Sequence, residues 1–311
     1  MTEVRARPAH LALVGPTATG KSALALAAAA ELGDVEIVSI DSMQVYRGMD
    51  IGTAKPTPAE RSAVPHHLVD LADPGEEFSV TRFQEAAAAA IAGIEVRGHR
   101  ALLVGGTGLY YQAVVDGLTP PGRDERLHQD LDARAEDGLT DLYAELSRVD
   151  PVAAGRIEPT NRRRVVRALE VTLATGRPFS SFGPGLFTSA PGLAVRRVGL
   201  WLPRAVTAAR INLRIEAMER QGLVDEVRRL AAAPAGLSRT ARQAIGYQEI
   251  LEHLEGATTL KEALGRTADR TRALSRRQRM WFRRDRRITW LGTEKNPLAV
   301  LPTLLATWTQ P

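Results

Sequence analysis

The stretch GPTATGKS, Gly15–Ser22, lies between the apolar run LALV and the alanine-rich run that ends in AAAAEL. Its spacing, G-x-x-x-x-G-K-S, predicts a loop whose backbone N–H groups wrap phosphate oxygens, while Lys21 adds a positive charge and Ser22 offers a hydroxyl ligand for magnesium. Ala9–Val14 is predicted to be a strand and Ser22–Leu32 a helix that ends at Gly33, in the order that such a phosphate-binding loop requires. The sequence therefore predicts a bound phosphate.

Three further apolar runs predict the rest of a sheet. VEIVSI (Val35–Ile40), ALLVGG (Ala101–Gly106) and VRRVGLWL (Val195–Leu202) are short strand candidates that alternate with helical stretches. Between the first two, Thr81 and Gln84 have the spacing of a capping box at the start of a helix. The alternation favours an α/β fold, with a parallel sheet like that of the P-loop NTPases flanked by helices.

The pattern changes to helical segments without strand runs from about Gly122 to Pro191. The Pro/Gly-rich stretches TPPGRDE and RPFSSFGPGLFTSAPG border this region, as is typical of an inserted subdomain. We therefore expect a P-loop core made of residues 1–121 and 195–311, interrupted by an all-helical insertion over residues 122–194.

The composition is that of an ordinary globular protein. The 311 residues are 44% hydrophobic and 25% charged, and the absence of cysteine excludes disulfides, a thiolate nucleophile and Cys-ligated zinc. The sequence contains neither a signal-like apolar region at its start nor an apolar run long enough to span a membrane, so we expect a cytoplasmic protein that does not bind membranes. The adjacent pair His66 and His67 is a weak metal signal.

The positive charge is concentrated in two places. The segment Arg266–Arg287 carries ten arginines and two aspartates, a net charge of +8, in a chain whose total is only +5. A shorter cluster, Arg156–Arg167, carries five arginines and one glutamate. A solvated helix face is one explanation for a single cluster of this kind, but two clusters in a phosphate-binding protein favour a nucleic acid partner.

Asp41 follows the expected strand VEIVSI, where many P-loop enzymes place an aspartate that holds magnesium. The strand ALLVGG ends instead in glycines followed by Thr107, so it offers no second acid, and such glycines allow a ligand to approach the backbone closely. From its position Asp41 is a candidate metal ligand or a candidate base.

Longer motifs make the pattern specific. GPTATGKS is followed in order by IDSMQVYRGMDIGTAKP, PHHLVD, LLVGGTGLYYQA, ARQAIGYQE and TRALSRRQRMWF. From about Leu11 to Arg287 the chain closely resembles the bacterial tRNA dimethylallyltransferases, also called tRNA isopentenyltransferases. It departs from the usual pattern at Thr19, where a serine or alanine is common, and at His128, where an arginine is common.

The resemblance implies transfer of a dimethylallyl group from dimethylallyl diphosphate to N6 of adenosine 37 in tRNA. The loop would hold the diphosphate as a leaving group, with Mg²⁺ on Ser22, and Thr17 and Arg214 would contact it. Asp41 resembles the general base of the family, and the metal-ligand alternative stays open. The expected diphosphate-binding residues are Gly15, Pro16, Thr17, Ala18, Thr19, Gly20, Lys21 and Ser22.

The tRNA anticodon stem-loop is the expected partner of a monomeric enzyme, with its target base flipped out of the stack and clamped by the arginine clusters and the insertion. The residues expected to contact tRNA are Asp41, Ser42, Met43, Gln44, Thr107, Asn161, Arg162, Arg163, Arg164, Gln243, Gly246, Tyr247, Arg276, Arg277 and Arg283. Three alternatives remain: an adenylate isopentenyltransferase acting on a free nucleotide, a P-loop small-molecule kinase, and a non-catalytic RNA-binding protein.

Overall fold

The computed structural model describes residues 10–118, 121–182 and 192–309. Its strands form one six-stranded parallel sheet in the order β3-β2-β4-β1-β5-β6. The strands are β1 (His10–Val14), β2 (Val35–Ile40), β3 (His66–His67), β4 (Arg100–Gly105), β5 (Val195–Trp201) and β6 (Thr289–Gly292). The expected parallel α/β sheet is confirmed, and the sequence missed only the short outer strands β3 and β6.

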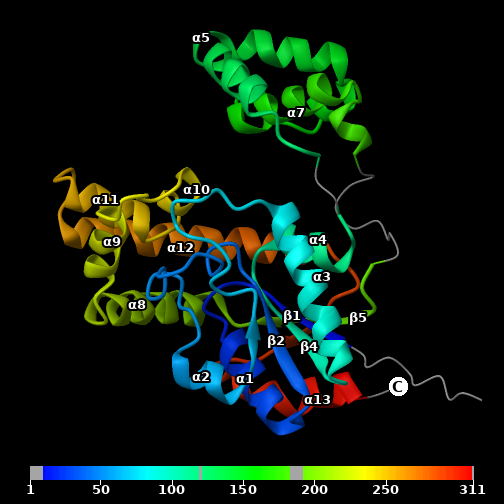
Figure 1. Ribbon diagram of the computed structural model, residues 1–311, viewed down its shortest axis with the longest axis vertical. Coiled ribbons are helices and arrows are strands. Elements are labelled where there is room, and N and C mark those ends of the chain that lie inside the picture. The colour runs from blue at the N-terminus through cyan, green and yellow to red at the C-terminus, as the bar shows by residue number, and fades with distance from the viewer. Residues whose placement is uncertain (1–9, 119–120, 183–191, 310–311) are drawn as a thin grey trace, which may run out of the picture. The chain divides into compact units, whose positions relative to one another are not determined.

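Helices cover both faces of the sheet (Figure 1). In β1, Leu11 and Leu13 pack with α1 (Lys21–Leu32) and α13 (Leu301–Thr309), whereas Ala12 and Val14 belong to the core shared with α3 (Val80–Val96) and α4 (Gly108–Val115). Because strands buried on both faces need apolar side chains at every position, the inner strands read as continuous apolar runs.

Further helices and one 3-10 turn lie outside the helical insertion. They are α2 (Pro58–Ala63), α8 (Arg204–Arg220), α9 (Leu223–Ala231), α10 (Arg239–Arg242), α11 (Tyr247–Leu254), α12 (Leu260–Phe282) and the 3-10 turn η2 (Pro297–Val300). Figure 1 shows α8 to α12 gathered on one side of the sheet. Ala18 of the phosphate loop is buried with Ile211 of α8 and Ala268 of α12, so these two helices lie against the loop.

The predicted capping box of α3 is wrong. The N-cap is Ser79, whose backbone is extended and whose side chain accepts a hydrogen bond from the Arg82 amide at 3.2 Å. Thr81 therefore lies inside the helix, and Gln84 donates to the Ala113 carbonyl at 2.7 Å, which ties α3 to α4. Ser79 is the N-cap because it is the polar residue that immediately precedes the helical backbone.

Two compact units divide the chain: the sheet unit, residues 1–117 and 191–311, and the helical unit, residues 118–190. The sequence predicts this insertion at residues 122–194. Its described elements are α5 (Glu125–Val149), interrupted at Gly138, α6 (Pro151–Ala154), α7 (Arg162–Thr175) and the 3-10 turn η1 (Phe179–Ser181). These helices pack around an apolar core of their own. None of the helices that the structure describes is both long and apolar enough to cross a membrane.

Candidate active site

Two glycines set the shape of the loop between β1 and α1. Gly15 and Gly20 both have positive φ, 142° and 92°. A Cβ at Gly15 would lie 2.4 Å from the Leu200 carbonyl oxygen, and one at Gly20 would lie 2.4 Å from the Pro297 side chain. The loop therefore passes so close to β5 and η2 that only glycine fits at these places.

The loop is also bonded to itself. The Thr19 hydroxyl and the Lys21 ammonium both donate to the Pro16 carbonyl, at 2.9 and 2.6 Å. Burial, helped by the nearby Arg214 cation and opposed by the Asp41 carboxylate, lowers the pKa of Lys21 to about 7. An anion placed in the loop would favour the charged ammonium, so the lysine is suited to bind phosphate.

A cavity of about 370 Å³ opens beside the loop. Its lining brings together the loop, the ends of β2 and β4, and residues of α8 and α12. The residues expected to contact diphosphate that line it are Thr17, Ala18, Gly20, Lys21 and Ser22, joined by Asp41, Gln44 and Arg214. The buried Gly15, Pro16 and Thr19 shape the loop behind this wall.

Two arginines of α8 face the loop. Arg214 donates to the Thr17 hydroxyl at 3.3 Å, and Arg210, one turn earlier, donates to the Ala18 carbonyl at 2.9 Å. Burial and the neighbouring Arg210 cation lower the pKa of Arg214, and Asp41 opposes that shift. Arg210 was missed by the sequence analysis, although its spacing of four residues from Arg214 places both on one face of a helix.

Asp41 stands at the end of β2 and lines the same cavity as Lys21. Its Oδ1 accepts hydrogen bonds from the amides of Met43 at 2.8 Å and Gln44 at 3.4 Å. Among the residues that the structure describes, Oδ2 has no hydrogen-bond donor. Burial raises the pKa of Asp41, while those amides and the cations of Lys21 and Arg214 counteract the rise.

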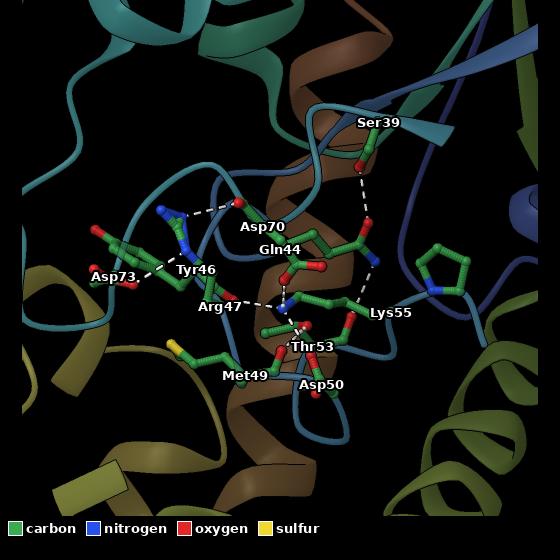
Figure 2. Close-up of polar contacts among 12 residues, drawn as sticks. Ser39, Gln44, Tyr46, Arg47, Met49, Asp50, Thr53, Lys55, Asp70 and Asp73 are labelled. Atoms are coloured by element: carbon green, nitrogen blue, oxygen red, sulfur yellow. Dashed lines mark hydrogen bonds and ion pairs between the residues drawn. The ribbon is translucent and has the colours of Figure 1, made fainter. Parts of the chain in front are cut away.

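The segment after Asp41 is held by internal contacts, shown in Figure 2. The Gln44 amide nitrogen donates to the Thr53 and Ala54 carbonyls, both at 3.2 Å, and its oxygen accepts from the Ser39 hydroxyl at 2.8 Å. The Ser42 amide donates to the Thr107 hydroxyl at 3.3 Å. The structure thus brings together Asp41, Ser42, Met43, Gln44 and Thr107, all expected to contact tRNA.

The segment ARQAIGYQE is divided by its burial. Gln243 is exposed, so it is open to a partner. Gly246 is buried with φ at 95°, and Tyr247 is fully buried, its hydroxyl donating to Glu226 at 2.5 Å. The Tyr247 side chain packs within the sheet unit. A contact between this side chain and RNA would therefore require it to leave the core.

Nine of the ten arginines of the segment 266–287 fall into two groups, and the tenth, Arg279, lies over the Trp201 ring, 5.8 Å from its centroid. Arg266, Arg270, Arg272 and Arg287 form ion pairs with acids of the sheet unit. Arg276, Arg277, Arg283, Arg284 and Arg286 are exposed, and none has an ion pair within the described part of the chain. Only the second group is free to meet phosphates, which sequence alone did not reveal.

In the helical unit, the Asn161 side chain caps α7 by accepting from the Arg164 amide at 3.2 Å. Arg162 is paired with Asp132 and Glu136, whereas Arg163 and Arg164 are exposed. His128 is buried and contacts Glu170 at 2.9 Å. The histidine that stands where an arginine is common in the family thus has its polar partner inside the helical unit.

Ser22 is the candidate magnesium ligand. Its side chain is exposed, lines the cavity, and makes no hydrogen bond to the described residues. Because Mg²⁺ keeps several waters and binds through a few protein oxygens plus phosphate oxygens, a single free hydroxyl beside a phosphate loop fits that ion.

Comparison with known proteins identifies families whose sequences are similar to this chain. The family model described as IPP transferase matches residues 44–285, and the model described as isopentenyl transferase matches residues 9–68. A tRNA dimethylallyltransferase of Moorella thermoacetica is 47% identical over 303 residues, 95% of this chain and 93% of that protein. One of Geobacter metallireducens is 47% identical over 293 residues, 94% of each.

Solved structures of proteins with names of the same kind are also similar to this chain. The full-length tRNA isopentenylpyrophosphate transferase of Bacillus halodurans is 38% identical, with a TM-score of 0.69 over 96% of each chain. A eukaryotic dimethylallyltransferase acting on tRNA is 26% identical, with a TM-score of 0.75 over 92% of this chain and 74% of that chain.

Proposed function

This chain belongs to the tRNA dimethylallyltransferase family, and we propose that it transfers the dimethylallyl group of dimethylallyl diphosphate to N6 of adenosine 37 in tRNA. The observation that carries the proposal is that a phosphate loop and a carboxylate share one cavity. Lys21, Asp41 and Arg214 line that cavity and influence one another's charge. Lys21 and Arg214 can therefore bind a leaving anion in this cavity while Asp41 accepts a proton.

The diphosphate is the leaving group, so the bond that breaks joins carbon to oxygen. Lys21 and Arg214 place positive charge where negative charge builds on that oxygen, and preorganised charge of this kind lowers a barrier strongly. Magnesium, bound through Ser22 and the diphosphate, would add further charge neutralisation. Because no phosphoryl group is transferred, the reaction needs no nucleoside triphosphate.

Asp41 acts as the base. An exocyclic adenine amine is a weak nucleophile, and removal of its proton while the carbon–nitrogen bond forms assists the attack. Oδ1 is held by two amides, which leaves Oδ2 to accept the proton. Burial raises the pKa of Asp41, which makes it a better proton acceptor than an exposed carboxylate.

The tRNA contacts are proposed at the exposed cations. Arg276, Arg277 and Arg283 of the sheet unit and Arg163 and Arg164 of the helical unit have the exposure that phosphate contacts need. Extrusion of the target base costs unstacking energy, which these backbone contacts would offset. We expect the enzyme to act as a cytoplasmic monomer.

Mass analysis of tRNA tests the proposal. The protein is incubated with unmodified tRNA, Mg²⁺ and dimethylallyl diphosphate, without ATP, and Asp41→Asn serves as the control. One added isopentenyl group on adenosine 37 is expected. Prenylation of free adenosine monophosphate in preference to tRNA, or a strict need for ATP, would contradict it.

A further inference from the structure

The segment that follows Asp41 folds around the amino group of Lys55. The Lys55 side chain is only 1% exposed. Its Nζ donates to the Tyr46 carbonyl at 2.5 Å, to Asp50 Oδ1 at 2.8 Å and to Asp70 Oδ1 at 2.6 Å, as Figure 2 shows. An ammonium has three protons, and these three acceptors use them all. Lys55 therefore lines the cavity without a proton to offer a ligand.

Glu226 of α9 holds the same segment at a second place. Its carboxylate accepts the backbone amides of Asp50, Ile51 and Gly52 at 3.0, 2.8 and 3.1 Å. It also accepts the Tyr247 hydroxyl. A Cβ at Gly52 would lie 2.4 Å from the Tyr247 ring, so the segment is pressed directly onto that ring.

The held segment leads to the reacting carboxylate. Gln44 is fixed by the Thr53 and Ala54 carbonyls, which immediately precede Lys55 in the chain. The amides of Met43 and Gln44 in turn hold Asp41 Oδ1. A continuous set of contacts thus connects Lys55 and Glu226 with the orientation of Asp41, although neither residue bonds to Asp41.

We propose that Lys55 and Glu226 are positioning residues, which fix the segment 42–56 at separate points and thereby aim Asp41 Oδ2 at the adenine amine. The inference rests on the proposed role of Asp41 in the transfer reaction. Catalytic groups need placement to within a fraction of an ångström, and a shift of about 1 Å can cost about 100-fold in rate. The two residues should therefore affect the chemical step and leave the phosphate loop unchanged.

The test measures single-turnover transfer at saturating tRNA over a range of dimethylallyl diphosphate concentrations, for Lys55→Met and Glu226→Gln. Rates are divided by the fraction of molecules that bind dimethylallyl diphosphate, so that loss of folded protein does not count. We expect the rate to fall about 10-fold to 100-fold and the KM for dimethylallyl diphosphate to stay within about twofold, since only orientation is lost. Asp73→Asn is the matched control, because Asp73 belongs to an exposed ion pair with Arg47 of the same segment.

Three outcomes would overturn the inference: normal rates in both variants, a raised KM with a normal rate, or an equal loss in Asp73→Asn. If Lys55→Met does not fold, Asp50→Ala replaces it. Asp50 is 58% exposed and its loss removes one of the three acceptors, so a slower chemical step is again expected and a normal rate contradicts the inference. Absence of transfer by the unmodified protein would refute the proposed function instead.

Discussion

Gln278 Oε1 accepts a hydrogen bond from the backbone amide of Thr17 at 2.8 Å. This contact links α12, which carries the exposed Arg276 and Arg277, directly to the phosphate loop. The Thr17 amide is one of the donors that the loop would turn toward a phosphate oxygen. A diphosphate bound as proposed would therefore compete with Gln278 for this donor.

Gln278→Glu should raise the KM for dimethylallyl diphosphate by about tenfold or more, because a carboxylate would hold the Thr17 amide more tightly and repel the anion. Gln278→Met, which offers no comparable acceptor, should leave the KM unchanged or lower it. Steady-state kinetics at saturating tRNA measure both. The competition is contradicted if glutamate and methionine change the KM equally.

Diphosphate binding should depend on the charge of Lys21. The pKa of Lys21 is lowered to about 7, so the free protein loses this charge as the pH rises through that value. A bound anion favours the charged form and raises the pKa again, so binding between about pH 7 and pH 9 should take up a proton. Calorimetry in buffers of different ionisation enthalpy measures the uptake.

The control for this measurement is Lys21→Met. It should bind diphosphate more weakly, with no lysine-linked uptake at pH 8, while its tRNA affinity stays the same. Uptake that persists in this variant would mean that another group takes the proton.

Asp41→Asn separates the two roles left open for this residue. Asparagine keeps the shape and can bind magnesium weakly, but it does not accept a proton as a carboxylate does. Loss of a general base typically costs about 100-fold to 10,000-fold in rate, or about 3 to 5 kcal/mol. Single-turnover transfer is measured across a magnesium titration. A slow rate that saturates at ordinary magnesium is expected, and recovery at high magnesium would identify Asp41 as a metal ligand.

The exposed arginines of α12 and the residues after it should control the salt dependence of tRNA binding. Replacing Arg276, Arg277 and Arg283 by glutamine should flatten the logarithmic slope by about 0.7 to 0.9 for each lost phosphate contact. The matched control is Arg266→Gln with Arg272→Gln, because both are already paired within the protein. Titrations at several salt concentrations distinguish the sets, and equal slopes would assign the exposed group no phosphate contact.

Local patterns predicted the parts of the site that lie close together in the chain. The predicted bounds of Val35–Ile40 match the observed strand, and α1 ends at Gly33 as expected, where the backbone is left-handed. Contacts over long separations had no such signal: Gln278 meets Thr17 across 261 positions, and Glu226 meets Gly52 across 174. Nothing in a one-dimensional pattern distinguishes Arg270, which pairs with Glu249, from the exposed Arg276.

The division of the sheet unit into two stretches of chain has a consequence for synthesis. Strand β1 pairs with β4 on one side and with β5 on the other, so one edge of the central strand has no partner until residue 201 has been made. The helical unit emerges in between, with a core whose members all lie between Leu127 and Phe179. Since chains fold from the N-terminus as they are made, the helical unit should fold while β1 still has an open edge. The phosphate loop is synthesised before the helical unit, yet it receives Arg214 and Gln278 only after that unit has been made. A ribosome-stalled chain that ends before α8 should therefore contain the signature GPTATGKS without its binding site.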